Sequence, residues 1–356
     1  MRLSYQVLLC GLSLSLFHCS DDGNDAPGIP LLPYAVYVAD EHGQTISVID
    51  ASADSVAGKI SIGIPGGHHG QGLIPHNVQV APDGKTVWVT ASTHDHGVAE
   101  QVLVIDPHAG HRIIARITLG TDQHLAHVVL DSASRFAYAT ANQPGEVVEI
   151  DAATFKIVRR IPLGNDRGPH GLRYHGGKLY IANLAGNSLG IVDLATGNVE
   201  ELALGGAAVQ TAVVPGGRYV FVSLYDTREV VRYEPSTGKV DRVSLPPDAK
   251  GPIQLYPTPD GKWLFVCDQG GLDGDPVSDK VYTIDIPSFS VSNTIVCGAA
   301  AHGVVVNNDG TRAYVTNSGE NTLTIVDVAT QKPVKTLPVG ETPNGVGFLF
   351  PGGGMP

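Results

Sequence analysis

The sequence predicts an all-β fold, a seven-bladed β-propeller with four short strands in each blade. Three observations predict it. A bulky aromatic residue recurs every 41 to 51 residues, an acidic residue recurs with it, and the two ends of the chain supply complementary parts of one unit. A period of roughly 40–50 residues with several short strands per unit is typical of a propeller, in which each unit forms one blade.

The two repeating markers occupy fixed places in every unit. The aromatic residue lies in the second strand: Tyr37, Trp88, Tyr138, Tyr180, Phe221, Phe265 and Tyr314. The acidic residue ends the third strand: Asp50, Asp106, Asp151, Asp193, Glu234, Asp285 and Asp327. Both markers give seven units. We expect the aromatic rings to be packing residues and the carboxylates to accept hydrogen bonds from amides of the following turn.

The last unit shows the four strands most clearly. Residues 302–317 contain two β-rich runs around an Asn-Asp-Gly turn, and further runs follow at 322–327 and 334–340. Short alternating runs separated by turn residues are the pattern of antiparallel strands.

The ends of the chain predict how the ring closes. The first unit begins at a second strand, 35–39, and the sequence ends on a first strand, 345–349, with no second strand after it. We expect the C-terminal strand to complete the N-terminal blade, which removes an open edge. One domain over 34–350 with a tail at 351–356 then replaces the two or three domains that the length alone suggests.

Short motifs within these repeats resemble a known family. Residues 313–317 contain Tyr-Val-Thr-Asn, and Pro-Asp-Gly-Lys occurs at 82–85 and 259–262. The sequence therefore resembles the YVTN-repeat family of seven-bladed propellers, akin to YncE-type periplasmic proteins and lactonase-like propellers. The resemblance covers about residues 34–350 and implies the fold, but it selects no activity because many activities share this architecture.

Residues 1–19 resemble the export signal of a bacterial lipoprotein. Arg2 precedes an apolar run at 7–17 that is too short to span a bilayer. Residues 16–19 resemble a lipobox that would lipidate Cys19, although His18 replaces the usual small residue, and 20–33 form a polar tether. We expect export to the periplasm or outer cell envelope, with a membrane lipid anchor through Cys19 or, alternatively, plain signal cleavage.

Composition narrows the partners and the chemistry. The net charge is −12, so a whole-chain basic footprint for nucleic acid is absent, and we expect no nucleic-acid partner and a monomer. The sequence has no Gly-x-Ser-x-Gly elbow, phosphate loop or haem-attachment motif. In the folded part only Cys267 and Cys297 remain. Both end strands of one blade, so we predict a disulfide, with free packing thiols as the alternative.

The 14 histidines are distributed unevenly between the two faces of the predicted propeller. The top face is the one on which each innermost strand begins. Ten histidines map to it: His42, His68, His69, His76, His94, His96, His124, His127, His170 and His302. Three map to the opposite face: His108, His111 and His175. At one equivalent position, where the innermost strand begins, the seven blades carry His76, His127, His170, Gln210, Gln254, His302 and Asn344.

This clustering predicts a binding site at the mouth of the central channel. Imidazole is the commonest transition-metal ligand, so we predict a copper or zinc site formed from the ring and a glycine-rich loop above it: His68, His69, His76, His127, His170 and His302. The remaining polar residues of the mouth would contact a small ligand: Gln210, Gln254, Asn344, His94, His96 and His124. A ring histidine that merely bonds a carbonyl of the next blade is the structural alternative.

Three functions follow from this site and stay open on the sequence alone. The first is an exported binding protein for a transition metal or small ligand. The second is an enzyme of lactonase or lyase type that uses ring histidines as acid or base. The third is a scaffold that presents loops to a protein or glycan without chemistry.

Overall fold

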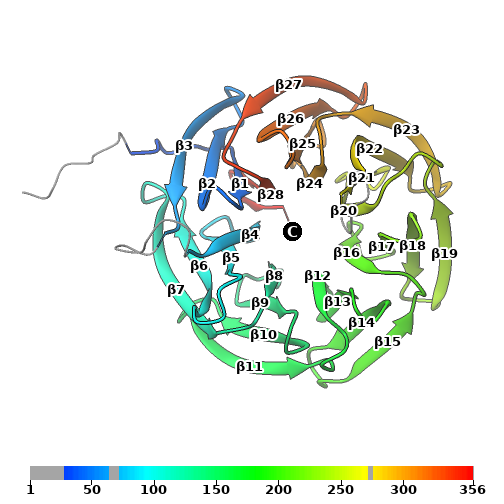
Figure 1. Ribbon diagram of the computed structural model, residues 1–356, viewed down its shortest axis with the longest axis horizontal. Helices are drawn as coiled ribbons and strands as arrows, with labels where there is room; N and C mark the ends of the chain where they lie inside the picture. The colour runs from blue at the N-terminus through cyan, green and yellow to red at the C-terminus, as the bar shows by residue number, and fades with distance from the viewer. Residues whose placement is uncertain (1–27, 64–71, 272–275, 356) are drawn as a thin grey trace, which may run out of the picture.

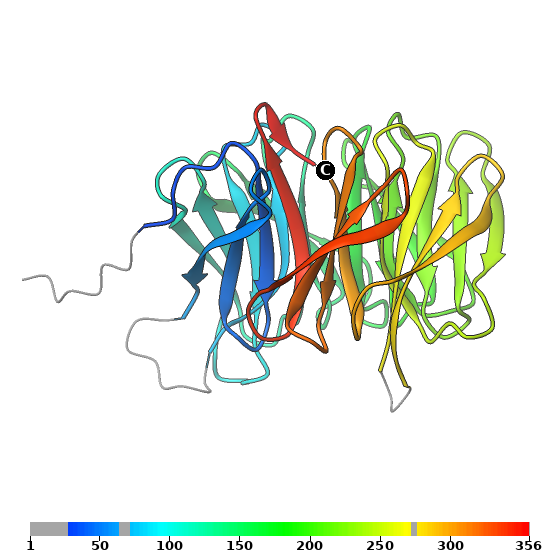
Figure 2. The ribbon, with the colours of Figure 1, turned by 90° about the horizontal axis from the view of Figure 1, so that it is seen from above.

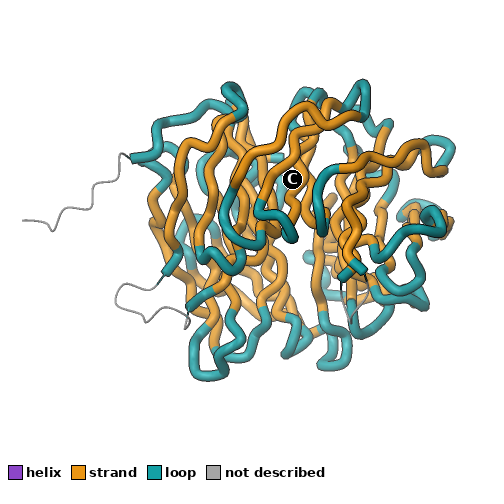
Figure 3. Tube along the Cα trace, turned by 45° about the horizontal axis from the view of Figure 1, so that its top comes forward, coloured by secondary structure: helices purple, strands orange, loops and turns teal. Residues whose placement is uncertain are grey.

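The structure is a computed structural model that describes residues 28–63, 72–271 and 276–355. Seven antiparallel sheets surround a central channel (Figure 1), and in the described residues every regular element is a strand (Figure 3). The predicted all-β, seven-bladed propeller is confirmed. The described chain has no helix of the length and apolarity needed to cross a membrane.

Each blade is a four-stranded meander, and its strands are given from the channel outward. Blade 1 has β28 (Pro343–Phe350), β1 (Ala35–Asp40), β2 (Thr45–Asp50) and β3 (Ser55–Ser61), with the short β29 (Gly353–Gly354) beside β28; blade 2 has β4 (Ile74–Val80), β5 (Val87–Ser92), β6 (Glu100–Asp106) and β7 (Arg112–Gly120); blade 3 has β8 (Leu125–Leu130), β9 (Phe136–Ala141), β10 (Glu146–Asp151) and β11 (Lys156–Pro162); blade 4 has β12 (Pro169–His175), β13 (Lys178–Asn183), β14 (Ser188–Asp193) and β15 (Val199–Ala203).

The remaining three blades repeat the same order. Blade 5 has β16 (Ala208–Val213), β17 (Val220–Leu224), β18 (Glu229–Glu234) and β19 (Lys239–Ser244); blade 6 has β20 (Pro252–Pro257), β21 (Trp263–Gly270), β22 (Val277–Asp285) and β23 (Ser290–Val296); blade 7 has β24 (Ala301–Val306), β25 (Arg312–Asn317), β26 (Thr322–Asp327) and β27 (Lys332–Pro338).

The predicted closure is confirmed. Strand β28 pairs antiparallel with β1, in a register that runs from Ala35 opposite Leu349 to Asp40 opposite Pro343. Both ends of the chain therefore contribute to blade 1, and residues 353–355 continue to the channel axis (Figures 1 and 2). We call the end of the channel where the innermost strands begin the histidine end, and the opposite end, where residues 353–355 lie, the arginine end.

The repeating markers have the structural roles expected from the sequence. All seven second-strand aromatic residues are buried, and Trp88 and Tyr37 are among the largest fully buried side chains. Six of the seven acidic markers accept bonds from backbone amides two or three residues later, as Asp151 does from Thr154 at 2.7 Å. The seventh, Glu234, accepts a bond from the Thr237 hydroxyl at 2.9 Å instead.

A bulge in every innermost strand sets the direction of the ring side chains. In each blade the register shifts where the ring residue lies, so that two residues oppose one on the second strand. On β12, His170 and Gly171 lie between the pairs Pro169–Asn183 and Leu172–Ile181. A bulge leaves a residue outside the ladder and re-aims its side chain.

Hydroxyl groups opposite these bulges join neighbouring blades. Thr140 Oγ1 accepts the amide of His127 at 3.0 Å and donates to the carbonyl of His170 at 2.7 Å. Three other blades make the equivalent bridge through Thr90, Ser223 and Thr316. These bridges satisfy backbone groups that the bulges free, and they hold the ring positions of adjacent blades together.

Cys267 occupies the same position in blade 6, opposite the bulge of β20. Cys267 and Cys297 are free thiols in the structure, so the predicted disulfide is not formed here. Cys267 lies on β21 and Cys297 directly follows β23, with β22 between these strands, so the cysteines are about two strand spacings or ~9–10 Å apart. That exceeds the Cα separation of a disulfide, about 4.4–6.8 Å. Cys267 is instead a small, fully buried packing residue between blades.

Candidate functional site

The structure places all seven ring residues in the bulges of the innermost strands, but the predicted single equivalent position is wrong, because His127, Gln210 and Gln254 lie one residue further along their strands than the other four. The seven are His76 on β4, His127 on β8, His170 on β12, Gln210 on β16, Gln254 on β20, His302 on β24 and Asn344 on β28. Glycine follows the ring residue where the next blade approaches closely. A Cβ atom at Gly171 would lie 2.0 Å from Oε1 of Gln210, so the Pro-His-Gly triplet at 169–171 has a packing cause.

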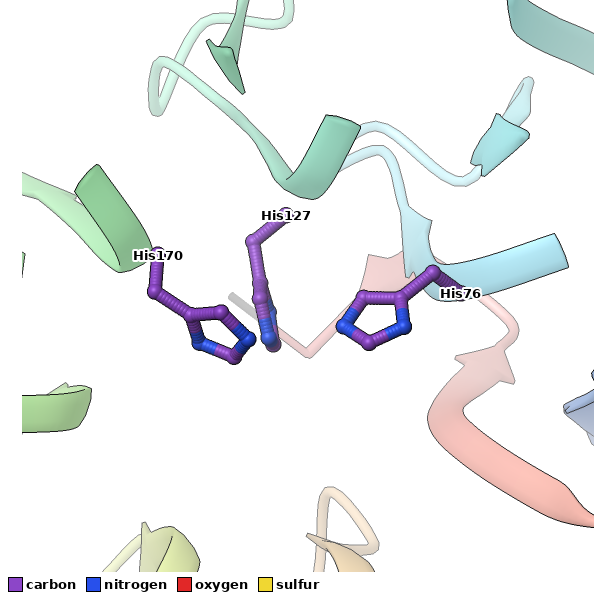
Figure 4. Close-up of side chains that lie close together, drawn as sticks. All are labelled: His76, His127 and His170. Atoms are coloured by element: carbon purple, nitrogen blue, oxygen red, sulfur yellow. The ribbon is translucent and has the colours of Figure 1, made fainter. Parts of the chain in front are cut away.

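Three of the four ring histidines converge on one point. His76, His127 and His170 each offer a ring nitrogen, and these three nitrogens all lie within 4.8 Å of one another (Figure 4). Their ring centroids are 5.1 to 5.7 Å apart, and all three pairs meet edge-on. We call these residues the three-histidine cluster.

Hydrogen bonds fix the rings of His76 and His170 so that Nε2 is the free nitrogen. His76 Nδ1 lies 2.9 Å from Glu41 Oε1, and His170 Nδ1 lies 2.9 Å from the carbonyl of Val209. Because a carboxylate and a carbonyl only accept, both Nδ1 atoms carry the proton and donate. His76 Nε2 is buried and has no hydrogen-bond partner among the described residues. Metal-binding histidines are held in this way in proteins, by a carboxylate or carbonyl behind the ring.

The ring of His127 is held differently. The Gln210 side-chain amide nitrogen lies 3.1 Å from His127 Nδ1, and the Gln210 carbonyl oxygen accepts the amide of Thr211 at 2.8 Å. With this amide orientation Gln210 donates, so Nδ1 of His127 accepts and Nε2 holds the proton. Binding a metal through Nε2 of His127 requires the proton to move to Nδ1 and the Gln210 amide to turn.

Burial keeps His127 and His170 uncharged at neutral pH. Burial, followed by the nearby His76 ring, lowers the pKa of His170 to about 4. Burial also lowers the pKa of His127 well below its usual range, helped by the charges of His170, His76 and Arg173. Burial alone would raise the pKa of Glu41, but the bond from His76 and the rings of His76 and His302 hold it at about 2. Metal binding requires neutral imidazoles, so the lowered pKa values of His127 and His170 favour a bound cation.

A cavity of about 510 Å³ opens next to the cluster. Its wall includes His76, His170, Glu41 and Asn344, with His302 and Gln269 on a neighbouring part. His302 Nδ1 donates to the side-chain oxygen of Gln269, and His302 Nε2 is buried without a hydrogen-bond partner among the described residues. His302 thus faces the same cavity but is outside the three-histidine cluster, although the sequence placed it among the metal ligands.

The other predicted residues divide into those near the mouth and those apart from it. His94 and His96 line a second cavity of about 610 Å³ with Glu41, and His96 bonds Asp122 at 2.6 Å on the surface. The side-chain amide nitrogen of Asn344 lies 3.2 Å from Nδ1 of His76. Gln254 and His124 are not part of the three-histidine cluster. Predictions that concern His68, His69 and Cys19 lie outside the described residues.

Two residues of the site were missed by the sequence argument. Glu41 follows β1 in the segment Asp-Glu-His-Gly, and Gln269 extends β21 beyond its cysteine. The prediction counted histidines only. An acidic residue in a loop on the histidine-rich face was a signal for Glu41, whereas no signal in the sequence indicated Gln269.

Comparison with known proteins supports the fold and leaves the activity open. No family model and no curated protein matches the chain. Among solved structures, it is similar to a functionally unknown protein from Desulfotomaculum acetoxidans (TM-score 0.71, 15% identity, covering 89% of this chain and 99% of that one). It is also similar to hydrazine synthase from Kuenenia stuttgartiensis (TM-score 0.69, 18% identity, covering 83% of this chain and 92% of that one). A third similar structure is a catalytically inactive histidine-to-alanine variant of virginiamycin B lyase from Staphylococcus aureus with quinupristin (TM-score 0.65, 16% identity, covering 81% of this chain and 95% of that one).

Proposed function

We propose that this protein binds one transition-metal ion, zinc or copper, through His76, His127 and His170 at the histidine end of the channel. The observation that carries the proposal is the convergence of three ring nitrogens within 4.8 Å from three consecutive innermost strands. Glu41 and the Val209 carbonyl support it, because they hold two of the rings with Nε2 free.

The ligand set suits a metal with an open coordination position. Nitrogens bound at about 2.0–2.1 Å to a tetrahedral ion lie about 3.3 Å apart, so the rings need to move inward by small rotations. Three histidines leave the fourth position free, as in catalytic zinc sites. The cavity of about 510 Å³ is lined by two of the three histidines, His76 and His170, and has room for a small ligand beside the ion.

Metal titration tests this function directly. Untagged protein reconstituted with zinc or copper(II) and then desalted should retain about one equivalent by elemental analysis, and His76→Ala should retain less than a tenth of that. His94→Ala is the matched control, because His94 is exposed on the same face and outside the cluster. If the wild type retains less than a tenth of an equivalent of zinc or copper, the proposal is wrong.

A second candidate is a lyase-type enzyme at the same mouth. His302 supports it, because the residue lines the cavity and its Nε2, left unprotonated while Nδ1 donates to Gln269, has no hydrogen-bond partner among the described residues and could accept a proton. The similarity to virginiamycin B lyase gives a substrate to try first. Quinupristin consumption, followed by mass spectrometry, should be lost in His302→Ala. Consumption equal in the variant, or absent in the wild type, rejects this candidate for that substrate.

We also propose that the protein is exported and anchored by lipid at Cys19, on the basis of the lipobox-like residues 16–19. Expressed from its full sequence in a bacterium, the protein should fractionate with membranes, and Cys19→Ser should release it or leave it unprocessed. Unchanged membrane association of a Cys19→Ser variant whose signal has been cleaved would contradict the anchor.

A further inference from the structure

A third cavity lies at the arginine end of the channel, and the proposed metal site does not use it. Its volume is about 690 Å³, within the range of about 300–1,000 Å³ typical of small-molecule sites. Arg173, Tyr174 and His175 from β12 line it, together with residues of the other innermost strands. Met355 lies at its mouth, where Gln79 Nε2 donates to the Met355 carbonyl at 2.5 Å.

Arg173 brings a positive charge into this cavity without a carboxylate to balance it. Its guanidinium donates to the carbonyl of Leu172 at 2.9 Å, and among the described residues no Asp or Glu oxygen lies within 4.0 Å of it. Burial lowers the pKa of Arg173, with the nearby Tyr256 acting in the opposite direction. Buried charges in proteins are ordinarily paired, so a cation that faces a cavity alone indicates an anionic ligand.

The rest of the wall is mainly apolar and so defines the class of anion. Its aliphatic and aromatic side chains include Leu130, Val213, Val214, Tyr256, Phe350 and Met355, and its other polar side chains include Ser132, His175 and Asn308. Inorganic phosphate would leave the apolar part of this wall uncovered. An organic acid would present its charge to the guanidinium and its hydrocarbon to the apolar wall.

We propose that the arginine end of the channel binds a small organic carboxylate with an apolar body, with Arg173 as its counter-ion. The guanidinium offers a planar pair of N–H donors that matches the two oxygens of a carboxylate. This site is separate from the proposed metal site, so the two proposals can be tested independently of each other.

Calorimetry with phenylacetate tests the proposal in the full-length protein. Phenylacetate should bind saturably at millimolar concentration or below, and the uncharged analogue 2-phenylethanol should bind at least tenfold more weakly. Arg173→Gln should weaken phenylacetate binding at least tenfold. Arg173→Lys should give an intermediate affinity, because it keeps the charge and loses the fork of donors. Arg135→Gln is the control, since Arg135 is 71% exposed and pairs with Asp131 outside the cavity.

Each result decides the proposal. No saturable binding of phenylacetate, or unchanged affinity in Arg173→Gln, overturns it. Tighter binding of inorganic phosphate than of phenylacetate overturns the class of ligand proposed. If Arg173→Gln does not fold by circular dichroism, the comparison of Arg173→Lys with the wild type decides instead, and equal affinities then overturn the proposal. His76→Ala should bind phenylacetate like the wild type, which separates this site from the metal site.

Discussion

The two ends of the central channel are built by the same seven strands and yet carry opposite chemistry. The histidine end gathers neutral imidazoles and an ionised carboxylate, a setting for a cation, whereas the arginine end sets one guanidinium in an apolar cavity, a setting for an anion. Strand β12 serves both, with His170 at one end and Arg173 at the other. The repeat therefore supplies positions around the axis, and the residues that break the repeat supply the chemistry.

The largest expected effect separates the two ends on this one strand. His170→Ala removes one of three proposed ligands and should lower zinc affinity by at least ~1000-fold, since groups behind the ligands alone are worth about 10–100-fold. The same variant should change phenylacetate affinity less than twofold. Zinc competition with a chromophoric chelator and calorimetry measure both. Equal losses at the two ends would show that they are one site.

Acid should destabilise the protein through its histidine end. Burial, then the nearby His76 ring, lowers the pKa of His302 from 6.5 to about 3. As the pH falls below 6.5 the unfolded chain takes up a proton that the folded chain does not, so stability falls by about 1.4 kcal/mol per pH unit for this group. From pH 7 to pH 4.5 the contribution is about 3 kcal/mol, and Glu41 stays ionised there because its pKa is about 2.

Urea unfolding at these two pH values measures the acid effect. His302→Asn cannot gain the proton, so its free energy of unfolding should fall less steeply than that of the wild type. His108→Asn on the opposite face is the control. If the wild type and His302→Asn lose the same stability between pH 7 and pH 4.5, His302 does not carry the effect.

Glu41 should tune the metal site without forming it. Glu41→Gln keeps the shape of the side chain and an oxygen for His76 Nδ1, but removes the negative charge 2.9 Å from that ring. We expect zinc affinity to fall about 10–100-fold, as for other carboxylates behind metal-bound histidines. Retained stoichiometry with a higher Kd is the expected signature, and an unchanged Kd would argue against a metal at His76.

The smallest expected effect concerns the hydroxyl bridge between blades 3 and 4. Thr140→Val removes the group that bonds both the His127 amide and the His170 carbonyl, and should destabilise the fold by about 1–3 kcal/mol. Zinc affinity should fall by less than tenfold. Thr316→Val removes the equivalent bridge between blades 7 and 1, which bonds none of the three histidines directly, and should cost similar stability with a smaller loss of zinc affinity.

The fold was predictable because its signals repeat. The aromatic and acidic markers fixed the number of blades, and the unmatched strands at 35–39 and 345–349 fixed the closure. The repeats indicated that ring residues lie where each innermost strand begins, but not that His127 lies one residue further along its strand than His170 and His302 on theirs. His76, His127 and His170 are neighbours in space simply because they lie on consecutive innermost strands.

The details of the candidate site could not be predicted, because they depend on features that do not recur from blade to blade. The bulge at His170 decides where the ring points, and Glu41 reaches the site from a loop more than thirty residues before its partner His76. His302 seemed equivalent to the other three histidines, yet β28 lies between β24 and β4, which separates it from the cluster. The disulfide failed for a similar reason, because β22 lies between the two cysteines.

Closure of blade 1 has a consequence for the order of events during synthesis. Glu41 lies just after β1 and Asn344 lies on β28, so His76 receives its two neighbours from the first and last parts of the ring. A ribosome that has completed six blades has not yet made the strand that brings these parts together. The surroundings of His76 are therefore complete only once β28 has been made, whereas the three proposed metal ligands all lie on the earlier strands β4, β8 and β12.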